Sequence, residues 1–385
     1  MPASAATPRP AAVQALMADL CGAPVVVERW DRLEPWAVAR AVLSGSSTHK
    51  TIIVKWVRTG AAEARTEPWR PANERAALQF LSEDLGLALA PRVIAADLSG
   101  GFLVLEDLAP RVALDQLVRR DGAVAHLGHL AEFARALGEL GAATAGRAEA
   151  YRARRRASGL PNPAADDDTQ TRFAELWSRA QEDGAALATP ITGPAASELA
   201  AVLDELHSPG PFLTLSNGDA ESNNILVHES GPADARLIDF EAAEYGHALL
   251  DAVCLHVPGP RWISVGRDPG TGGLAEHYRR ALTRGVPEAQ EDRLYGFALA
   301  AACTSWALLR LQRFAVLDAR APGDRSRLQL VETLESAART AEAHRTLPAL
   351  TGWFRRAAEG LRHRWPDADV DLTDTVRFPP YSPRR

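Results

Sequence analysis

The side chains best suited to chemistry lie in one stretch of the sequence, residues 213–241. Asp219 and Asn224 stand in a polar loop between two short apolar segments, and Asp239 follows a third. We expect all three to emerge from the same ends of neighbouring strands. Magnesium prefers one or two carboxylate or amide oxygens together with phosphate oxygens and water. The pattern therefore favours phosphoryl transfer, which depends on aligning a hydroxyl and neutralising phosphate charge.

These three side chains would have different roles in that reaction. Asn224 and Asp239 would supply oxygen ligands to Mg2+, and Asp219 would orient the attacking hydroxyl and take its proton late in the reaction. Aspartate and asparagine also form turns in loops, and any one of them alone favours that structural interpretation. The hypothesis of a reaction site therefore depends on a phosphate-binding residue elsewhere in the chain.

Lysine usage points to such a residue. The chain has 43 basic residues, of which only Lys50 and Lys55 are lysines. Lys55 lies in the apolar segment 51–57, where an ammonium on a flexible stem could hold the α and β phosphates of a nucleotide. Glu74, at the start of the following helical segment, could pair with it. The alternative is that Lys55 is a surface residue and Glu74 a helix-start acid favoured by the helix dipole.

The first third of the chain carries strand signals. Apolar segments rich in Val and Ile, bounded by turn residues, lie at residues 25–30, 38–43, 51–57, 92–96 and 102–108. Short turns join the second segment to the third and the fourth to the fifth, which indicates two antiparallel hairpins. Residues 71–86 have helical spacing, so the expected order is three strands, a helix and two strands.

From about residue 111 onward, helical periodicity dominates. A short β segment near residues 213–240 interrupts it. Residues 152–170 contain an arginine cluster, a stretch with Pro and Gly and three consecutive aspartates, which we interpret as an exposed connection. The most apolar run, residues 294–309, is shorter than the roughly 20 residues of a membrane span, and we expect it to be a buried core helix.

Composition excludes several classes of protein. The 385 residues are 46% apolar and 24% charged, with a net charge of −6, which is typical of a soluble globular protein and disfavours nucleic-acid or anionic-membrane partners. The three cysteines, Cys21, Cys254 and Cys303, lack the spacing of a zinc motif or a disulfide framework. The N-terminus lacks a signal-peptide pattern. We therefore expect a cytoplasmic protein with no nucleic-acid and no membrane partner.

Three short motifs occur in order along the chain. They are Leu103 to Leu108, which ends in Glu106, Asp107 and Leu108; the loop Asn217, Gly218, Asp219 with Asn224 five positions later; and Ile238, Asp239, Phe240 and Glu241. The set resembles the hinge, catalytic loop and metal-binding segment of the aminoglycoside phosphotransferase family, whose relatives include choline and homoserine kinases. The resemblance covers roughly residues 25–310.

This resemblance implies an α+β, bilobal, protein-kinase-like fold, with a small N-terminal antiparallel-sheet lobe (residues 1–108) and a larger, mainly helical C-terminal lobe (residues 109–385). The second lobe would hold the catalytic loop 215–227, the metal-binding segment 237–246 and acceptor-binding helices. The implied cofactors are ATP and Mg2+. Adenine would hydrogen-bond to the hinge backbone near Glu106, Asp107 and Leu108.

The sequence departs from the family pattern at two places. Asn217 stands where the family has a histidine, so the scaffolding of the loop is expected to differ. The first hairpin has no glycine where kinases usually let backbone amides approach the phosphates. Side chains that could partly substitute are Arg32, Trp36 and Arg40.

Three functions follow as hypotheses. The favoured one is ATP- and Mg2+-dependent phosphorylation of a hydroxyl on a small molecule, in antibiotic resistance or natural-product metabolism. A second is a Ser/Thr kinase acting on a ribosomally made precursor peptide, with a possible biosynthetic partner protein such as a lyase. A third is a nucleotide-binding pseudokinase scaffold. From residue 247 to the end the chain has 20 arginines and 16 acids, which disfavours a polycationic acceptor.

Overall fold

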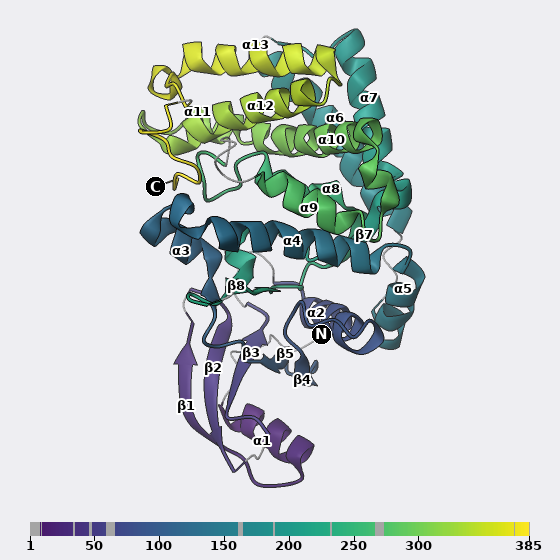
Figure 1. The fold of residues 1–385 in the computed structure, drawn as a ribbon, viewed down its shortest axis with the longest axis vertical. Coiled ribbons are helices and arrows are strands. Elements are labelled where there is room, and N and C mark those ends of the chain that lie inside the picture. Colours follow the sequence, from purple (N-terminus) through teal and green to yellow (C-terminus); the bar gives the residue numbers. More distant parts are fainter. Residues whose placement is uncertain are drawn as a thin grey trace.

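A five-stranded antiparallel sheet forms the N-terminal lobe of the computed structural model (Figure 1). Its strands are β1 (Val26–Arg32), β2 (Val38–Ser44), β3 (Thr51–Trp56), β4 (Val93–Asp97) and β5 (Phe102–Glu106). They lie in the order β1-β2-β3-β5-β4. The five predicted strands and both predicted hairpins are confirmed.

The structure describes most of the chain. The described residues are 8, 10–33, 35–45, 48–58, 66–160, 165–187, 189–231, 233–265, 273–372 and 374–384, with the backbone alone for 165–174. Parts of the sequence interpretation lie outside this range, namely the start of the N-terminus at residues 1–7, the β2–β3 turn at residues 46–47 and residues 161–164 of the predicted connection.

Alternating side chains give the sheet two different faces. On β3, Ile52 and Val54 are fully buried on one face, and Ile53 and Lys55 point to the other. The buried face packs against helix α1 (Pro10–Cys21), which the sequence interpretation did not include. Successive side chains of a strand point to opposite faces. Lys55 follows the buried Val54 and therefore faces away from this core.

Helix α2 (Arg70–Gln79) follows β3 and continues into a π-helical turn, Phe80–Asp84. Together they cover the segment for which the sequence predicts a helix. The amide nitrogen of Asn73 donates hydrogen bonds to the backbone carbonyls of Glu241 (3.1 Å) and Ala243 (3.0 Å). Helix α2 is therefore fastened directly to the C-terminal lobe.

Helices make up most of the C-terminal lobe (Figure 1). They are α3 (Leu114–Asp121), α4 (Leu127–Thr144), α5 (Ala148–Ala157), α6 (Ala165–Ala186), α7 (Pro194–His207), α8 (Leu249–Ala252), α9 (Leu274–Leu282), α10 (Asp292–Leu311), α11 (Phe314–Asp318), α12 (Arg325–Ala343) and α13 (Pro348–Arg364). Helix α4 packs against α9 and lies between the sheet lobe and the rest of the helical lobe, while α10, α12 and α13 pack in succession at the end of the molecule farthest from the sheet (Figure 1).

Helix α10 corresponds to the apolar run at residues 294–309. Within the described part of the chain it is the helix that is long and apolar enough to cross a membrane, and 72% of that window is buried inside the fold. Leu299, Cys303 and Leu308 are among its buried side chains. The prediction of a buried core helix is confirmed.

Two separate small sheets carry the segments around the predicted reaction site. The strands of this lobe are β6 (Val112–Ala113), β7 (Leu213–Ser216), β8 (Ile225–Val227), β9 (Ala235–Leu237) and β10 (Glu244–His247). β7 pairs with β10, whereas β6, β8 and β9 form a different sheet. β8 and β9 pair with Ile225 opposite Leu237, so Asn224 and Asp239 emerge from the same end of neighbouring strands as expected. The expectation is wrong for Asp219, because the strand before it belongs to the other sheet.

The interpretation of residues 152–170 as an exposed connection is wrong for most of its length. Helix α5 extends into it and α6 begins inside it at Ala165, while residues 161–164 lie outside the described range. Alanine is the strongest helix former, and aspartates in a first helical turn interact favourably with the helix dipole. Ala165 and the aspartates that follow it therefore start a helix.

Candidate active site

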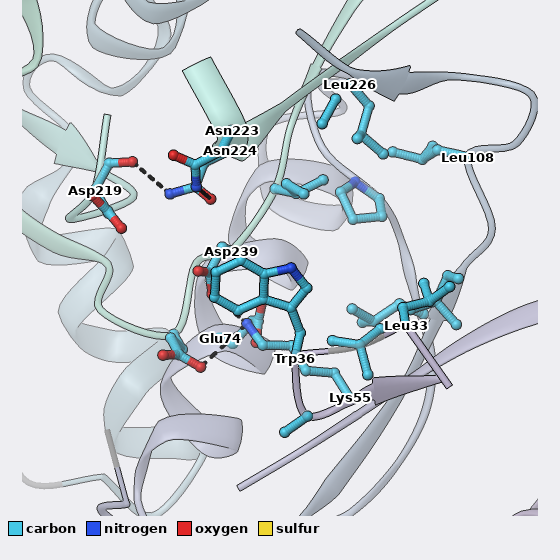
Figure 2. A pocket seen from close by; sticks show the side chains of 18 of the residues that line it. Leu33, Trp36, Lys55, Glu74, Leu108, Asp219, Asn223, Asn224, Leu226 and Asp239 are labelled. Atoms are coloured by element: carbon cyan, nitrogen blue, oxygen red, sulfur yellow. Dashed lines mark hydrogen bonds and ion pairs between the residues drawn. The ribbon is translucent and has the colours of Figure 1, made fainter. Parts of the chain in front are cut away.

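A cleft of about 770 Å3 lies between the two lobes. All eight site residues expected from the sequence line it, namely Lys55, Glu74, Glu106, Asp107, Leu108, Asp219, Asn224 and Asp239. Figure 2 shows the carboxylates, the ammonium and the amides on one side of the cleft, and Leu33, Leu108 and Leu226 on the other. The cleft thus has a charged part and an apolar part.

Lys55 is the centre of the charged part. Its ammonium forms ion pairs with Asp239, with Glu74 at 2.8 Å and with Glu241 at 3.3 Å. Burial alone would lower the pKa of Lys55, but the three carboxylates together raise it well above its usual value. Lys55 is therefore a charged residue inside the cleft, and the alternative of a surface strand residue is wrong.

Glu74 connects three segments. One carboxylate oxygen pairs with Lys55 of β3, and the other accepts a hydrogen bond from the backbone N–H of Phe240 at 3.1 Å. The side chain is buried, which raises the pKa of Glu74, while the neighbouring ammonium opposes that shift. Glu74 fixes the position of Lys55 relative to the segment that carries Asp239.

Asn217 scaffolds the loop 215–227, the predicted catalytic loop. Its amide nitrogen donates to the carbonyl of Ile238 at 3.1 Å, and its amide oxygen accepts from the N–H of Asp219 at 3.2 Å. Asn224 closes the other end of the loop by donating to the carbonyl of Asp219 at 2.8 Å. Although it differs from the family's histidine, the buried Asn217 therefore ties Asp219 to the segment leading to Asp239.

Gly218 allows the close approach of these two segments. It has φ of +80°, and a Cβ atom at this position would lie 2.3 Å from the carbonyl oxygen of Ala242. Both the left-handed backbone and the contact require glycine. The central residue of the Asn217-Gly218-Asp219 motif is thus explained by geometry.

The donor set near Lys55 fits a hard cation. Carboxylate oxygens of Glu74, Asp239 and Glu241 lie within 4.8 Å of one another. Asp239 has φ of +64°, a conformation that aspartate adopts more readily than most residues. Asn224 lines the same cleft, where its amide oxygen accepts a hydrogen bond from the amide nitrogen of Asn223 at 2.7 Å. Carboxylate and amide oxygens of this kind suit Mg2+.

Hydrogen bonds to Asp107 and Glu106 hold the hinge segment in place. The carboxylate of Asp107 accepts two hydrogen bonds from Arg40, at 2.9 and 3.1 Å, and one from the N–H of Ala109. The N–H of Glu106 donates to the carbonyl of Arg92 at 2.9 Å. The side chain of Asp107 therefore positions the hinge, and the contact of the hinge backbone with adenine stays a prediction.

Trp36 stands at the turn of the first hairpin and reaches across the cleft. The guanidinium carbon of Arg58 lies 5.3 Å from its ring centroid, and that of Arg261, in the C-terminal lobe, lies 5.9 Å away. Of the three residues expected to substitute for glycine, Trp36 and Arg40 line the cleft. Arg32 lies over the ring of Trp56, at 5.7 Å, on β3.

Glu221 is a cleft residue that the sequence interpretation missed. It lies in the catalytic loop, and only 9% of its surface is exposed. Burial and the neighbouring Asp219 raise the pKa of Glu221 to about 8, against the opposing influence of Arg261 and Arg310. The sequence feature that could have identified Glu221 is its position as an acidic residue in the short loop between Asp219 and Asn224.

Asp251 anchors the catalytic loop from behind. Its carboxylate accepts a hydrogen bond from the hydroxyl of Ser216 at 2.6 Å, and that hydroxyl oxygen accepts from the N–H of Gly218 at 2.9 Å. Burial raises the pKa of Asp251 to about 7. This residue therefore supports the loop that carries Asp219.

An antiparallel-sheet lobe, a larger helical lobe and a charged cleft between them define a protein-kinase-like fold. The model of the phosphotransferase enzyme family matches residues 39–297, more than half of the chain. The chain belongs to this family, and it is a phosphotransferase with a hydroxyl acceptor.

Solved structures of similar architecture come from several bacteria. The choline kinase LicA from Streptococcus pneumoniae is 15% identical, with a TM-score of 0.44 and coverage of 86% of this chain and 98% of that one. A putative aminoglycoside phosphotransferase from Ralstonia eutropha is 15% identical, with a TM-score of 0.49 and coverage of 92% and 98%. The macrolide 2′-phosphotransferase MphH from Brachybacterium faecium is 14% identical, with a TM-score of 0.45 and coverage of 84% and 97%. No curated protein matches the sequence.

Proposed function

We propose that the protein is an ATP- and Mg2+-dependent kinase of a small-molecule hydroxyl, such as that of an antibiotic or a natural-product metabolite. The observation that carries this proposal is the ion pairing of Lys55 with Glu74 and Asp239, in the same cleft as Asp219 and Asn224. The cleft thus holds an ammonium that can bind phosphates, oxygens that can bind a cation and a carboxylate that can accept the proton of a hydroxyl.

The proposed reaction forms one bond and breaks one. The acceptor oxygen attacks the γ-phosphorus, the bond from that phosphorus to the β–γ bridging oxygen breaks, and ADP leaves. Asp219 accepts the hydrogen bond of the attacking hydroxyl, orients it and receives its proton. The loop bonds made by Asn217 and Asn224 hold Asp219 in place during this step.

The two ends of the nucleotide would bind to different parts of the cleft. Lys55 would hold the α and β phosphates, with its rotamer fixed by Glu74. Bound Mg2+, held by Asn224 and Asp239, would neutralise the charge of the phosphate oxygens. The apolar side, which includes Ile53, Leu105 and Leu226, suits the flat face of adenine next to the hinge.

The alternative functions differ in the acceptor or in activity. A peptide substrate would bring a biosynthetic partner protein, and a pseudokinase would bind nucleotide without transferring phosphate. The two hydrogen bonds of Asn217 support an ordered catalytic loop and so favour activity over the pseudokinase. We place the protein in the cytoplasm, without nucleic-acid or membrane partners, on the basis of its composition and charge.

Calorimetric titration with ATP and MgCl2, followed by an ADP-release assay with a panel of hydroxyl-bearing small molecules, tests the proposal. We expect ATP binding and acceptor-stimulated ADP release that disappears in Asp219→Asn. Absence of nucleotide binding would rule out all three functions. ATP binding without transfer to any acceptor, small molecule or precursor peptide, would identify the pseudokinase.

A further inference from the structure

Two histidine rings meet where helix α3 ends and α4 begins. α3 ends at Asp121, a 3₁₀ turn (Ala123–His126) follows, and α4 starts at the next residue. The Nδ1 atoms of His126 and His129 are 3.3 Å apart, and the ring centroids are 5.4 Å apart. His126 is buried and His129 is half-buried. Neither is among the described residues that line the cleft between the lobes, so the pair is a separate feature of the helical lobe.

The other nitrogen of each ring contacts an oxygen. Nε2 of His126 lies 2.8 Å from a carboxylate oxygen of Asp121, and Nε2 of His129 lies 2.8 Å from the backbone carbonyl oxygen of His228. Hydrogen bonds from Arg120 and from His126 lower the pKa of Asp121 to about 2, so its carboxyl is ionised at neutral pH. A carboxylate and a carbonyl oxygen can only accept. Each Nε2 atom therefore carries a hydrogen and donates it.

This arrangement leaves two lone pairs facing each other. A neutral imidazole carries one hydrogen, and in both rings that hydrogen is on Nε2. Neither Nδ1 atom can then donate to the other, although only 3.3 Å separates them. Two acceptors this close need a positive charge between them. That charge is either an extra proton on one ring or a metal ion bound to both.

The geometry around the two rings favours a metal ion. Two nitrogen ligands of a tetrahedral Zn2+ ion each lie about 2.0–2.1 Å from the metal, which places them about 3.3 Å from each other. The two Nδ1 atoms have this separation. Metal-bound histidines commonly donate their other N–H to a carboxylate or to a backbone carbonyl, which fixes the ring. Asp121 and the carbonyl of His228 supply one of each.

We propose that His126 and His129 bind a divalent transition-metal ion such as Zn2+ through their Nδ1 atoms, at a site separate from the cleft. Imidazole nitrogens suit Zn2+, Ni2+ and Cu2+, whereas Mg2+ prefers oxygen ligands. Because His129 is half-buried, water can complete the coordination. Through the carbonyl of His228 the ion would tie the start of α4 to the end of β8, the strand that follows Asn224. This inference does not depend on the acceptor or on the proposed reaction.

Calorimetric titration of the metal-free protein with ZnCl2 tests the inference. The ligand variants are His126→Gln and His129→Gln, and Asp121→Asn changes the carboxylate behind the first ring. Two controls are His363→Gln, an exposed histidine on α13, and Asp239→Asn, which removes a carboxylate of the cleft that could also attract zinc. Thermal unfolding with and without ZnCl2 is measured on the same samples.

We expect the unmodified protein to bind zinc at this site and to unfold at a higher temperature when zinc is present. His126→Gln and His129→Gln should each weaken the affinity by at least about 100-fold, which corresponds to roughly 2.8 kcal/mol, and should remove the rise in unfolding temperature. Asp121→Asn keeps both ligands and should weaken the affinity by about 10-fold. His363→Gln and Asp239→Asn should keep the affinity of the unmodified protein.

Several results would overturn the inference. Absence of zinc binding would mean that the two rings share a proton instead. Equal zinc affinity in the unmodified protein and in both ligand variants would place the ion elsewhere, and a loss confined to Asp239→Asn would place it in the cleft. If the buried His126 cannot be replaced without unfolding the protein, the half-buried His129 still decides between these outcomes.

Discussion

Lys55 on β3 and Asp239 after β9 form an ion pair between the two lobes, although 184 positions separate them in the sequence. Glu74 and Glu241 face the same ammonium. The guanidinium of Arg70 also pairs with Glu241 at 3.6 Å, so three carboxylates face two cations and leave an excess of negative charge. The arrangement both joins the lobes and prepares the cleft for a cation.

Removing this ammonium should destabilise the protein and increase its response to magnesium. In Lys55→Met the buried Glu74 loses its ion-pair partner, and the loss of one partner of a buried pair costs about 3–5 kcal/mol. Millimolar MgCl2 should recover part of this stability, because the carboxylate oxygens lie within 4.8 Å of one another. Thermal unfolding with and without MgCl2 measures both effects.

The other lysine supplies the control. Lys50 is exposed, and Lys50→Met removes the same charge outside the cleft. We expect this variant to match the unmodified protein in unfolding temperature and in its magnesium response. If the two lysine variants behaved alike, the ion pairs of Lys55 would not contribute to folding.

Replacing Asp219, the proposed base, should affect turnover far more than nucleotide binding. Asp219→Asn keeps the backbone hydrogen bonds of this residue to Asn217 and Asn224 but removes the proton acceptor. General-base catalysis contributes roughly 100- to 10,000-fold, so kcat should fall by that order. Steady-state kinetics and calorimetry with ATP distinguish the two effects.

Asp204→Asn provides a matched exposed substitution on α7. It should leave both kcat and ATP affinity at the values of the unmodified protein. A parallel fall of kcat and ATP affinity in Asp219→Asn would show that the residue acts in nucleotide binding and not as the base.

Asn217→Ala should loosen the catalytic loop. The substitution removes the hydrogen bonds to Ile238 and Asp219 and leaves a buried carbonyl and N–H without these partners. We expect the free energy of unfolding to fall by about 1–3 kcal/mol and kcat to fall because Asp219 is no longer held. Asn217→His, which introduces the family's residue, should restore more activity than alanine does. Equal activity of all three proteins would contradict this role.

Much of the fold could be predicted because strands, turns and helices leave local patterns in the sequence. Alternating apolar residues placed Lys55 on a strand, and turn residues defined the hairpins around it. The site residues were recognisable because their spacing is preserved within short segments, as for Asp219 and Asn224. Their meeting in one cleft required only that the two lobes face each other, which the combination of motifs implied.

The remaining features depend on long-range contacts that no local pattern contains. The pairing of β7 with β10 instead of β8 is decided by packing, since strands of three or four residues have little register preference of their own. Glu221 reads as an ordinary polar loop residue, and its burial arises from Gly259, 38 positions away in the sequence. The contact of Trp36 with Arg261 likewise joins two distant loops.

Stability should depend on pH through Asp251. This carboxylate is buried, accepts a hydrogen bond from Ser216 and has Glu244 as a charged neighbour, and its pKa rises from the usual 3.8 to about 7. The folded state therefore holds this proton more tightly than the unfolded state does. It follows that the free energy of unfolding contributed by Asp251 falls as pH rises from about 4 to about 7 and is constant above that range.

Asp251→Asn removes this dependence while keeping an oxygen that can accept the hydrogen bond of Ser216. Relative to the unmodified protein, the variant should be more stable at pH 8 by up to about 4 kcal/mol, since one pKa unit corresponds to about 1.4 kcal/mol. The advantage should shrink steadily towards pH 4, where the carboxyl is protonated in both states. Urea unfolding at pH 4.5, 6 and 8 measures the difference, in which the contributions of other titrating groups cancel. A difference that stays constant with pH, or grows as the solution becomes more acidic, would mean that Asp251 is charged in the folded protein and that a cation compensates it.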